Sequence, residues 1–404
     1  MNTHASTTAM PPQRGPAAAS LRLRYLLIPP VLLAIATAAL LIRHADYNLV
    51  ALYSQCHAHA RLPFLSRVPI LGPPSCYIVS FFQTAVASSR AAATMAAALS
   101  FVAALLTVYV VEGARVCNRP AVLIAYPTGP LLAFTLAGGA FVWELAVAPA
   151  FLRRAREILL ARRAAREGGV AALSPFDPEL GRGLRHLRSD AEAVAIPVAV
   201  LLGFIVPSVL MVALGTPVAV GVWLFAPVYV ALVRGVVRVV LPRLRARSVD
   251  PNAAEAEDLR SLHLEAHRVS LALVYAAPVL CSALSHGLLI FSLLAGKDDR
   301  RDMTRATLGF IEIDVVFTGL TVLYWLGVEV GWRVVGIMVG VSVVLGPGAG
   351  ICAGWVYREE RWQEAFVKGP GGSRRSSRRG SRGSSVEAGP GDERRADEQT
   401  PLLT

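Results

Sequence analysis

The stretch TLGFIEIDVVFTGLTVLYWLGVEVG, residues 307–331, decides how the rest of the chain is interpreted. It is long and apolar enough to cross a bilayer as one helix, because the hydrocarbon core needs about 20 helical residues. Two acids, Glu312 and Asp314, lie inside it, and a third, Glu329, lies near its end. An ionised carboxylate costs roughly 2.5–3.5 kcal/mol in the membrane on insertion scales, so acids kept there are functional candidates. The stretch therefore predicts a membrane-spanning helix that carries chemistry.

The composition of the whole chain is also typical of a membrane protein. Of its 404 residues, 54% are hydrophobic and 17% are charged, whereas a soluble domain carries about 25% charged residues. Apolar runs near the length of a span recur along the chain. They cover residues 25–42, 91–112, 129–151, 192–214, 218–241, 269–295, 307–331 and 334–356. We predict an all-α, polytopic transmembrane helix bundle of about eight spans, with a range of seven to nine.

The ends of the chain differ from this bundle, which we expect to occupy residues 21–357. Residues 1–20 are rich in Pro, Ala and Thr, and residues 358–404 in Arg, Ser and Gly. Both tails are predicted to be disordered, since such mixtures bury little apolar surface. The ending EQTPLL fits an acidic dileucine signal, in which Glu398, Leu402 and Leu403 would bind a sorting adaptor. These features predict a multi-pass protein of an endomembrane, either the endoplasmic reticulum or the vacuole.

The net charge of +12 does not predict nucleic-acid binding. Most basic residues are arginines in the predicted loops and tail, where they suit anionic lipid head groups. We therefore expect the lipid bilayer and a hydrophobic small molecule as partners. The sequence has no phosphate-binding loop, dinucleotide fingerprint or nucleophile elbow. His57 and His59 lack the further ligands that a metal site needs, so we expect neither a cofactor nor a metal.

Residues near the ends of the predicted spans are assigned structural roles. Four acids in such positions are predicted to be solvated helix caps. They are Glu112, Asp190, Glu192 and Glu329. Cys56 and Cys76 share one predicted loop and can form a disulfide if that loop faces an oxidising lumen.

Asp314 is the predicted proton donor, with Glu144 or Glu312 as a second acid or base. Helical spacing places Asp314 and Trp325 on one face, whereas Glu312 points about 200° away. Desolvation in hydrocarbon favours the protonated carboxyl, which can act as a general acid. Each of these acids can instead pair with a neighbouring helix and only hold the bundle together.

Aromatic side chains in the spans are the predicted lining of a substrate cavity. Their ring faces attract cations by about 0.5–2 kcal/mol each, and a dry cavity prevents early capture of a carbocation by water. The predicted lining consists of Trp143, Tyr229, Tyr275, Tyr324 and Trp325, and His286 lies on the same face as Tyr275. A carboxylic acid facing such a cavity is what a carbocation-generating cyclase requires.

Three stretches resemble one group of membrane proteins. They are AEAVAIPVAVLLGFIVPSVLMVAL (residues 191–214), WLFAPVYVAL (223–232) and GFIEIDVVFTGLTVLYW (309–325). They are similar to fungal polytopic proteins of terpenoid and meroterpenoid pathways, including the membrane-bound terpene cyclases of the ascochlorin and ascofuranone type. Asp314 and Trp325 match the acid and downstream Trp of the late span in that group, and Tyr229 its Trp/Pro/Tyr span.

The resemblance implies an endomembrane cyclase of secondary metabolism that protonates an epoxide or alkene of a prenylated substrate without a cofactor. The alternative is a proton-coupled transporter or exporter of a small metabolite, in which the same acids would load and release protons. A receptor or scaffold protein also stays open.

Overall fold

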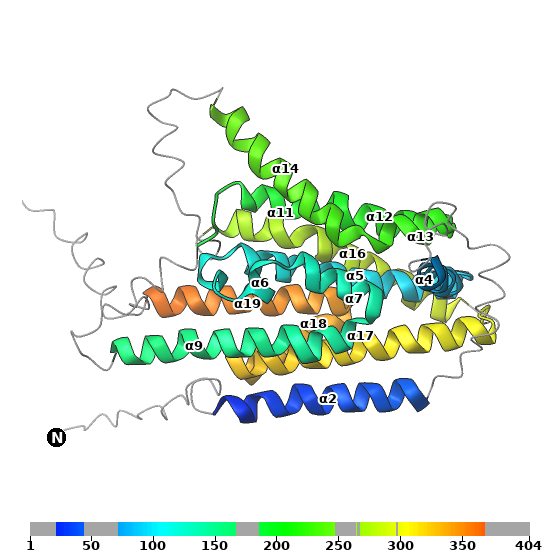
Figure 1. Cartoon of the computed structure of the whole chain (residues 1–404), viewed down its shortest axis with the longest axis horizontal. Coiled ribbons are helices and arrows are strands. Elements are labelled where there is room, and N and C mark those ends of the chain that lie inside the picture. The colour runs from blue at the N-terminus through cyan, green and yellow to red at the C-terminus, as the bar shows by residue number, and fades with distance from the viewer. Residues whose placement is uncertain are drawn as a thin grey trace, which may run out of the picture. The chain divides into compact units, whose positions relative to one another are not determined.

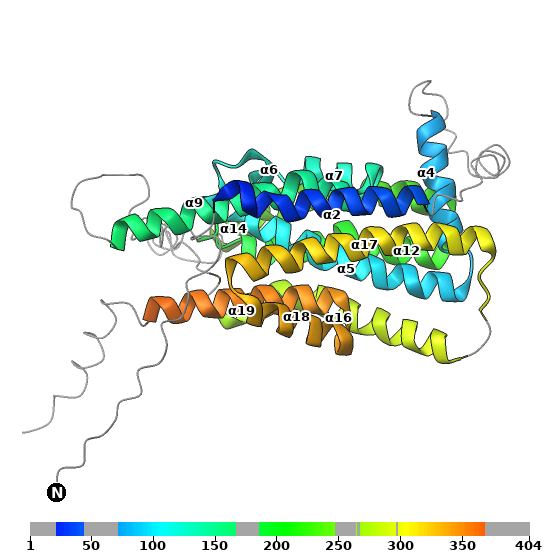
Figure 2. The ribbon, with the colours of Figure 1, turned by 90° about the horizontal axis from the view of Figure 1, so that it is seen from below.

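The computed structural model describes residues 22–43, 72–166, 186–246, 264, 267–295 and 298–367. Within these ranges the chain is all-helical, apart from one β-bridge between Arg115 and Leu187. Most helices run side by side along a common axis (Figure 1, Figure 2). The chain divides into two compact units after Glu360, and the bundle described below is the first unit. The prediction of an all-α bundle is confirmed.

Five helices in the described part of the chain are long and apolar enough to cross a membrane. They are α2 (Leu23–Arg43), α5 (Ser89–Ala114), the continuous helix formed by α11 (Glu192–Val200), η4 (Leu201–Ile205) and α12 (Val206–Leu214), α16 (Arg268–Leu294) and α17 (Asp302–Glu329). A sixth crossing is formed if α13 (Pro217–Leu224) and α14 (Ala226–Ala246), which are bent by 58° at their junction, count as one span.

The outer surface of the bundle is apolar, as expected where lipid contacts a protein. Large hydrophobic side chains are exposed on α2, α14 and α16. Examples are Leu32, Ile35, Leu232, Val236, Leu284 and Phe291. The exposed apolar faces and the long apolar helices together indicate an integral membrane protein.

The predicted count of about eight spans is not confirmed, because two of the predicted spans are hairpins. Gly138 has a φ of +104° and interrupts the run 129–151, and Gly346 has a φ of +90° and interrupts the run 334–356. Glycine adopts such angles without the steric cost of a side chain. The first arms, α7 (Thr128–Ala137) and α18 (Trp332–Leu345), rise only about 15 Å and 21 Å. Neither crosses a core of about 30 Å.

The second arms of the hairpins leave from these glycines. The first consists of α8 (Gly139–Val142), the π-helix η3 (Trp143–Val147) and α9 (Ala148–Arg166). The second is α19 (Pro347–Val367), which continues past the predicted end of the bundle at residue 357. The remaining short elements of the described chain are η2 (Val116–Asn118) and α6 (Val122–Ala125), between α5 and α7.

The helix α4 (Gly72–Ala85) differs from the others because it lies across one end of the bundle (Figure 2). Cys76 on α4 is disulfide-bonded, whereas Cys117, Cys281 and Cys352 are free thiols. Cys56 lies outside the described residues, as do His57, His59, the predicted tail 1–20 and the predicted adaptor contacts Glu398, Leu402 and Leu403. A disulfide on α4 fits an oxidising compartment on that side of the membrane.

Candidate functional site

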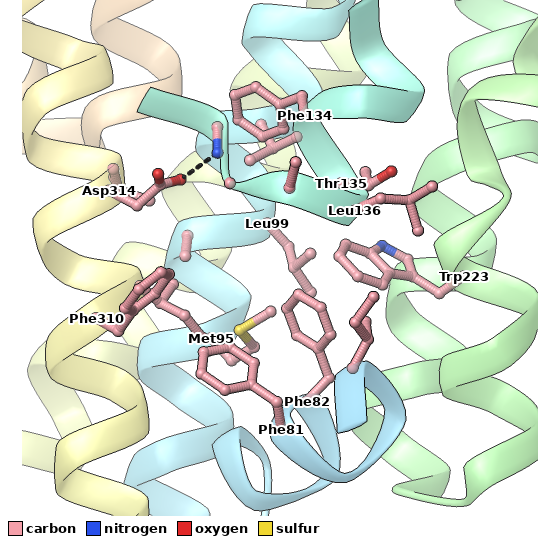
Figure 3. Close-up of a pocket in the computed structure, with 18 of the residues that line it drawn as sticks. Phe81, Phe82, Met95, Leu99, Phe134, Thr135, Leu136, Trp223, Phe310 and Asp314 are labelled. Atoms are coloured by element: carbon pink, nitrogen blue, oxygen red, sulfur yellow. Dashed lines mark hydrogen bonds between the residues drawn. The ribbon is translucent and has the colours of Figure 1, made fainter. Parts of the chain in front are cut away.

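An apolar cavity of about 540 Å³ lies where α4 meets α5, α7, α13 and α17 (Figure 3). Six aromatic side chains line it, together with aliphatic residues such as Met95 and Leu99. The aromatic residues are Tyr77, Phe81, Phe82, Phe134, Trp223 and Phe310. Among the residues that line the cavity, Asp314 is the one with a charged side chain. The site therefore combines one carboxyl group with an otherwise apolar, aromatic wall.

The aromatic rings contact one another around the cavity. Phe82 lies edge-on to Trp223, with ring centroids 4.7 Å apart, and Phe81 lies edge-on to Phe82 at 5.3 Å and to Phe310 at 5.6 Å. The indole N–H of Trp223 donates to Ser208 Oγ at 3.0 Å. With that donor satisfied, the ring presents its apolar surface to the cavity. These contacts hold the aromatic wall in one arrangement.

Asp314 is held at the break of the first hairpin. The backbone N–H of Gly139 donates to Oδ2 at 3.0 Å, and that of Ala140 donates to Oδ1 at 2.7 Å. Both groups belong to the first turn of α8, where N–H groups lack partners within the helix. Each carboxyl oxygen keeps a second acceptor position, so Asp314 can still carry a proton or contact a ligand.

The sequence Gly138–Gly139 makes this approach possible. A Cβ atom at Gly139 would lie 2.3 Å from the ring of Phe134 and 2.7 Å from Asp314 Oδ2. Both distances are well below van der Waals contact, so only glycine fits without displacing its neighbours. The pair of glycines therefore brings α7, the acid of α17 and an aromatic wall residue together at one point (Figure 3).

Glu144 lies behind this point, on the π-helix η3, and does not line the cavity. Its side chain is fully buried. Oε1 accepts a hydrogen bond from the hydroxyl of Thr37 on α2 at 3.0 Å, and Oε2 has no partner among the described residues. The charges of Glu144 and Asp314 are close enough to interact. A π-turn beside two acids is notable, because such turns are frequent at functional sites.

Glu312 points away from the cavity. It is exposed, and it lines a separate surface groove with Arg305 and Phe317. Its nearest electrostatic partner is Arg300 in the preceding loop. The structure thus brings Asp314 and Glu144 near each other and leaves Glu312 on another face of α17.

Two of the predicted lining residues, Trp143 and Trp325, belong to a different row of rings. Both are almost fully buried in the core. Trp143 contacts Tyr109 edge-on, Tyr109 contacts Phe151, and Phe151 stacks on Trp325 with centroids 4.1 Å apart. The row ends where Trp325 meets Trp355 at 4.9 Å. These rings pack the bundle and are not part of the cavity wall.

The other predicted lining residues are distributed over the bundle. Tyr324 donates from its hydroxyl to the carbonyl of Leu26 at 2.9 Å, and His286 Nε2 lies 3.1 Å from the carbonyl oxygen of Val343. Tyr275 is buried, and its hydroxyl has no partner among the described residues. Tyr229 is half-buried on α14, and its backbone lies close to Gly203. The structure does not bring these four residues to the cavity.

A buried ionic cluster replaces the solvated caps that were predicted for Glu112 and Glu329. Arg358 Nη1 lies 2.9 Å from Glu112 Oε1, and Arg358 Nη2 lies 2.6 Å from Glu329 Oε1. Arg115 Nη2 contacts Glu359 Oε1 at 2.7 Å. All five side chains are nearly inaccessible.

Glu192 is a third predicted cap that is buried instead. It is fully inaccessible, and Arg234 Nε and Nη2 each donate to it at 2.8 Å. The prediction of solvated caps was wrong for Glu112, Glu192 and Glu329, because arginines distant in the sequence neutralise these acids inside the protein.

Sequence reasoning missed most of the cavity wall. Tyr77, Phe81 and Phe82 lie on α4, in an apolar patch too short to span a membrane. Trp223 lies in the last turn of the short helix α13, before the bend. The available signal was the aromatic cluster CYIVSFF at residues 76–82, which is unusually rich in rings for a chain with 7% aromatic residues.

No protein-family model matches the chain, and no curated protein or solved structure is similar to it.

Proposed function

We propose that the protein is an integral-membrane terpene cyclase of an endomembrane, which binds a prenylated, epoxidised substrate in the aromatic cavity. The observation that carries this proposal is the position of Asp314. It is the one acid in the lining of a cavity of about 540 Å³ whose other walls are aromatic and aliphatic. Small-molecule sites of about 300–1,000 Å³ with few polar groups are typical, and this one suits a long hydrocarbon chain.

In this proposal Asp314 acts as the general acid. Its proton passes to the epoxide oxygen, the carbon–oxygen bond breaks, and a tertiary carbocation forms while the oxygen becomes a hydroxyl group. The π electrons of an internal alkene then form the new carbon–carbon bond. The final cation loses a proton from an adjacent carbon to the Asp314 carboxylate, so the product is an isomer of the substrate and the acid is regenerated.

The surrounding groups have distinct roles in this reaction. The N–H groups of Gly139 and Ala140 stabilise the carboxylate left after proton transfer. The faces of Phe81, Phe82 and Phe310 stabilise the migrating positive charge by about 0.5–2 kcal/mol each. Glu144 serves as a second acid or base behind Asp314, because the two charges interact.

The proposal is tested by measuring whether membranes that contain the full chain convert candidate substrates into isomers. Microsomes are fed epoxidised farnesyl and geranylgeranyl phenols, and products are followed by mass and retention time. New isomers of unchanged mass, absent with Asp314→Asn, support the proposal. Isomers formed equally by the variant would refute the assigned acid, and an absence of isomers from the whole panel would count against cyclase activity.

A proton-coupled transporter is the second candidate. The two hairpins whose helices break at Gly138 and Gly346 favour it. Helices that break inside a membrane often place their half-helix ends at the binding site of a transporter, and Gly138 puts such an end beside Asp314. Vesicles with an imposed proton gradient distinguish the two. Gradient-driven uptake of an unmodified prenylated compound supports transport, whereas chemical isomerisation without a gradient supports the cyclase.

A further inference from the structure

Four arginines gather at the end of the bundle around one buried acid. Arg234 and Arg238 lie one turn apart on α14, and both contact Glu192, at 2.8 Å and 3.2 Å. Arg188 is near enough for its charge to be repelled by this pair and by Arg119. Glu192 is therefore shared among several guanidinium groups, and it can neutralise only one of their charges.

Arg188 is held in place by the backbone. Its N–H donates to the carbonyl of Ala114 at 3.2 Å, and the N–H of Val116 donates to the carbonyl of His186 at 3.2 Å. This short two-stranded contact fixes residues 186–188 beside the end of α5. Main-chain hydrogen bonds thus hold Arg188 in the cluster. Its position does not depend on an ion pair of its side chain.

The charge of Arg188 is poorly compensated. Its Nε is buried and has no hydrogen-bond partner among the described residues. Burial, followed by repulsion from Arg234, Arg238 and Arg119, lowers the pKa of its guanidinium, and Glu192 opposes this only in part. Within the described part of the chain, the four arginines together with Glu192 and Asp190, which is near Glu192 in sequence, carry a net charge of 4 − 2 = +2. An anion is the missing partner that such an arrangement favours.

The neighbouring surface indicates what kind of anion fits. Guanidinium groups bind phosphate oxygens through paired N–H donors, which is why arginine is preferred in phosphate sites. The side chains of Leu232 and Val236 lie two positions from Arg234 and therefore on another face of α14, where they are exposed and apolar, as expected for a helix that contacts lipid. A helix that contacts lipid has phospholipids beside it, so a phospholipid is one source of the phosphate.

We propose that the cluster of Arg119, Arg188, Arg234 and Arg238 is a binding site for a phosphate group, carried by an anionic phospholipid or present as free inorganic phosphate. Arg234 and Arg238 lie on α14, whereas Arg119 and Arg188 lie in the segments that precede α6 and α11; none of the four lines the aromatic cavity. The site is independent of the proposed reaction.

The test uses the full chain in phosphatidylcholine nanodiscs, with thermal unfolding as the readout. One arm adds phosphatidic acid to the nanodiscs, and the other adds inorganic phosphate to the buffer. A ligand that binds only the folded state raises Tm progressively as its concentration rises above its Kd. We expect phosphatidic acid to raise the Tm of the wild type, and Arg188→Gln to weaken the apparent affinity on the order of tenfold.

The matched control is Arg333→Gln, which removes an exposed arginine of α18 outside the cluster and should leave the response unchanged. Arg188→Lys keeps the positive charge and should retain part of the response. If Arg188→Gln unfolds in phosphatidylcholine alone, Arg119→Gln replaces it, since Arg119 is exposed. A response to inorganic phosphate alone that Arg188→Gln abolishes identifies free phosphate as the ligand. No response of the wild type in either arm, or equal responses of Arg188→Gln and Arg333→Gln, overturns the proposal.

Discussion

Asp314 Oδ1 lies 2.7 Å from the backbone nitrogen of Ala140, so the acid of the span α17 caps the start of α8 in the first hairpin. The contact couples two features that are distant in the sequence. It anchors the hairpin that begins with α7, and it fixes the direction of the carboxyl group in the cavity wall. A substitution at Asp314 therefore affects both stability and chemistry, and the two effects need separate measurements.

Asp314→Asn should reduce isomer formation about 10²- to 10⁴-fold, because the amide cannot donate the proton that a general acid supplies. The asparagine oxygen can still accept one of the two N–H groups, so the variant should fold and lose about 1–3 kcal/mol of stability at most. Product formation by membranes and the Tm of purified protein measure the two effects.

Glu312→Gln is the matched control for this experiment, since it removes a carboxyl from the same helix but outside the cavity. It should leave the rate within a few-fold of the wild type. A larger loss of activity with Glu312→Gln than with Asp314→Asn would contradict the assignment of the acid.

Gly139→Ala should lower both stability and activity. The added Cβ would meet the Phe134 ring at 2.3 Å and Asp314 Oδ2 at 2.7 Å, and overpacking of this kind costs typically 1–3 kcal/mol. Gly129→Ala, on α7, is the control, because nothing lies within 4 Å of its Cβ position. That substitution should be neutral or stabilise the helix by up to about 1 kcal/mol. Equal Tm values for the two variants would show that the close approach is not required.

Phe310→Leu should slow cyclisation by about 2- to 30-fold, which corresponds to a lost cation–aromatic contribution of about 0.5–2 kcal/mol. It should also change the ratio of products, because the cation is then stabilised at different carbons. Phe291→Leu, on the exposed face of α16, is the control and should change neither quantity. An unaltered product ratio in Phe310→Leu would remove this ring from the reaction.

Hydropathy alone predicted the long helices correctly, since α5, α16 and α17 need only continuous apolar sequence. It could not separate a span from a hairpin, because the break depends on single glycines such as Gly138 and Gly346 with positive φ. Asp314 could be selected as an acid within a span, but the aromatic residues that line its cavity were not those predicted. Four of the six aromatic wall residues lie on α4 and α13, which are too short to stand out by length.

The buried ionic cluster was missed for a different reason. Glu112 and Glu329 lie at helix ends, where local sequence favours a solvated cap. Their partner Arg358 lies on α19, beyond the predicted end of the bundle. Pairing over 246 residues is visible only after the helices are placed in space.

Arg358→Met should destabilise the bundle by about 3–5 kcal/mol, because it leaves Glu112 and Glu329 buried without their shared cation. Arg153→Met, which removes an exposed arginine paired with Glu157, should cost less than about 1 kcal/mol. Chemical unfolding in one detergent compares the two variants directly. Similar losses for both would show that the cluster contributes no more than a surface pair.

Asp299 should make the start of α5 sensitive to acid. Its carboxylate accepts the hydroxyl of Ser89 at 2.7 Å and the N–H groups of Ser89 and Arg90 at 2.9 Å and 3.3 Å. These bonds, above all the one from the Ser89 hydroxyl, hold the pKa of Asp299 below its ordinary value of 3.8. A lowered folded-state pKa means that the stabilisation is fully present above about pH 4 and is lost as the pH falls further.

The pH experiment compares the wild type with Asp299→Asn. The wild type should have the higher Tm above pH 4, and the difference should shrink toward zero in more acidic buffer, where both side chains are neutral. The pKa of the adjacent Asp298 is also lowered, by its hydrogen bond with Arg300. That group is present in both proteins, so its contribution cancels in the difference. Asp302→Asn removes the same charge from an exposed side chain at the start of α17 and should change Tm little. A Tm difference between the wild type and Asp299→Asn that stays constant with pH would show that Asp299 acts through its shape and not through its charge.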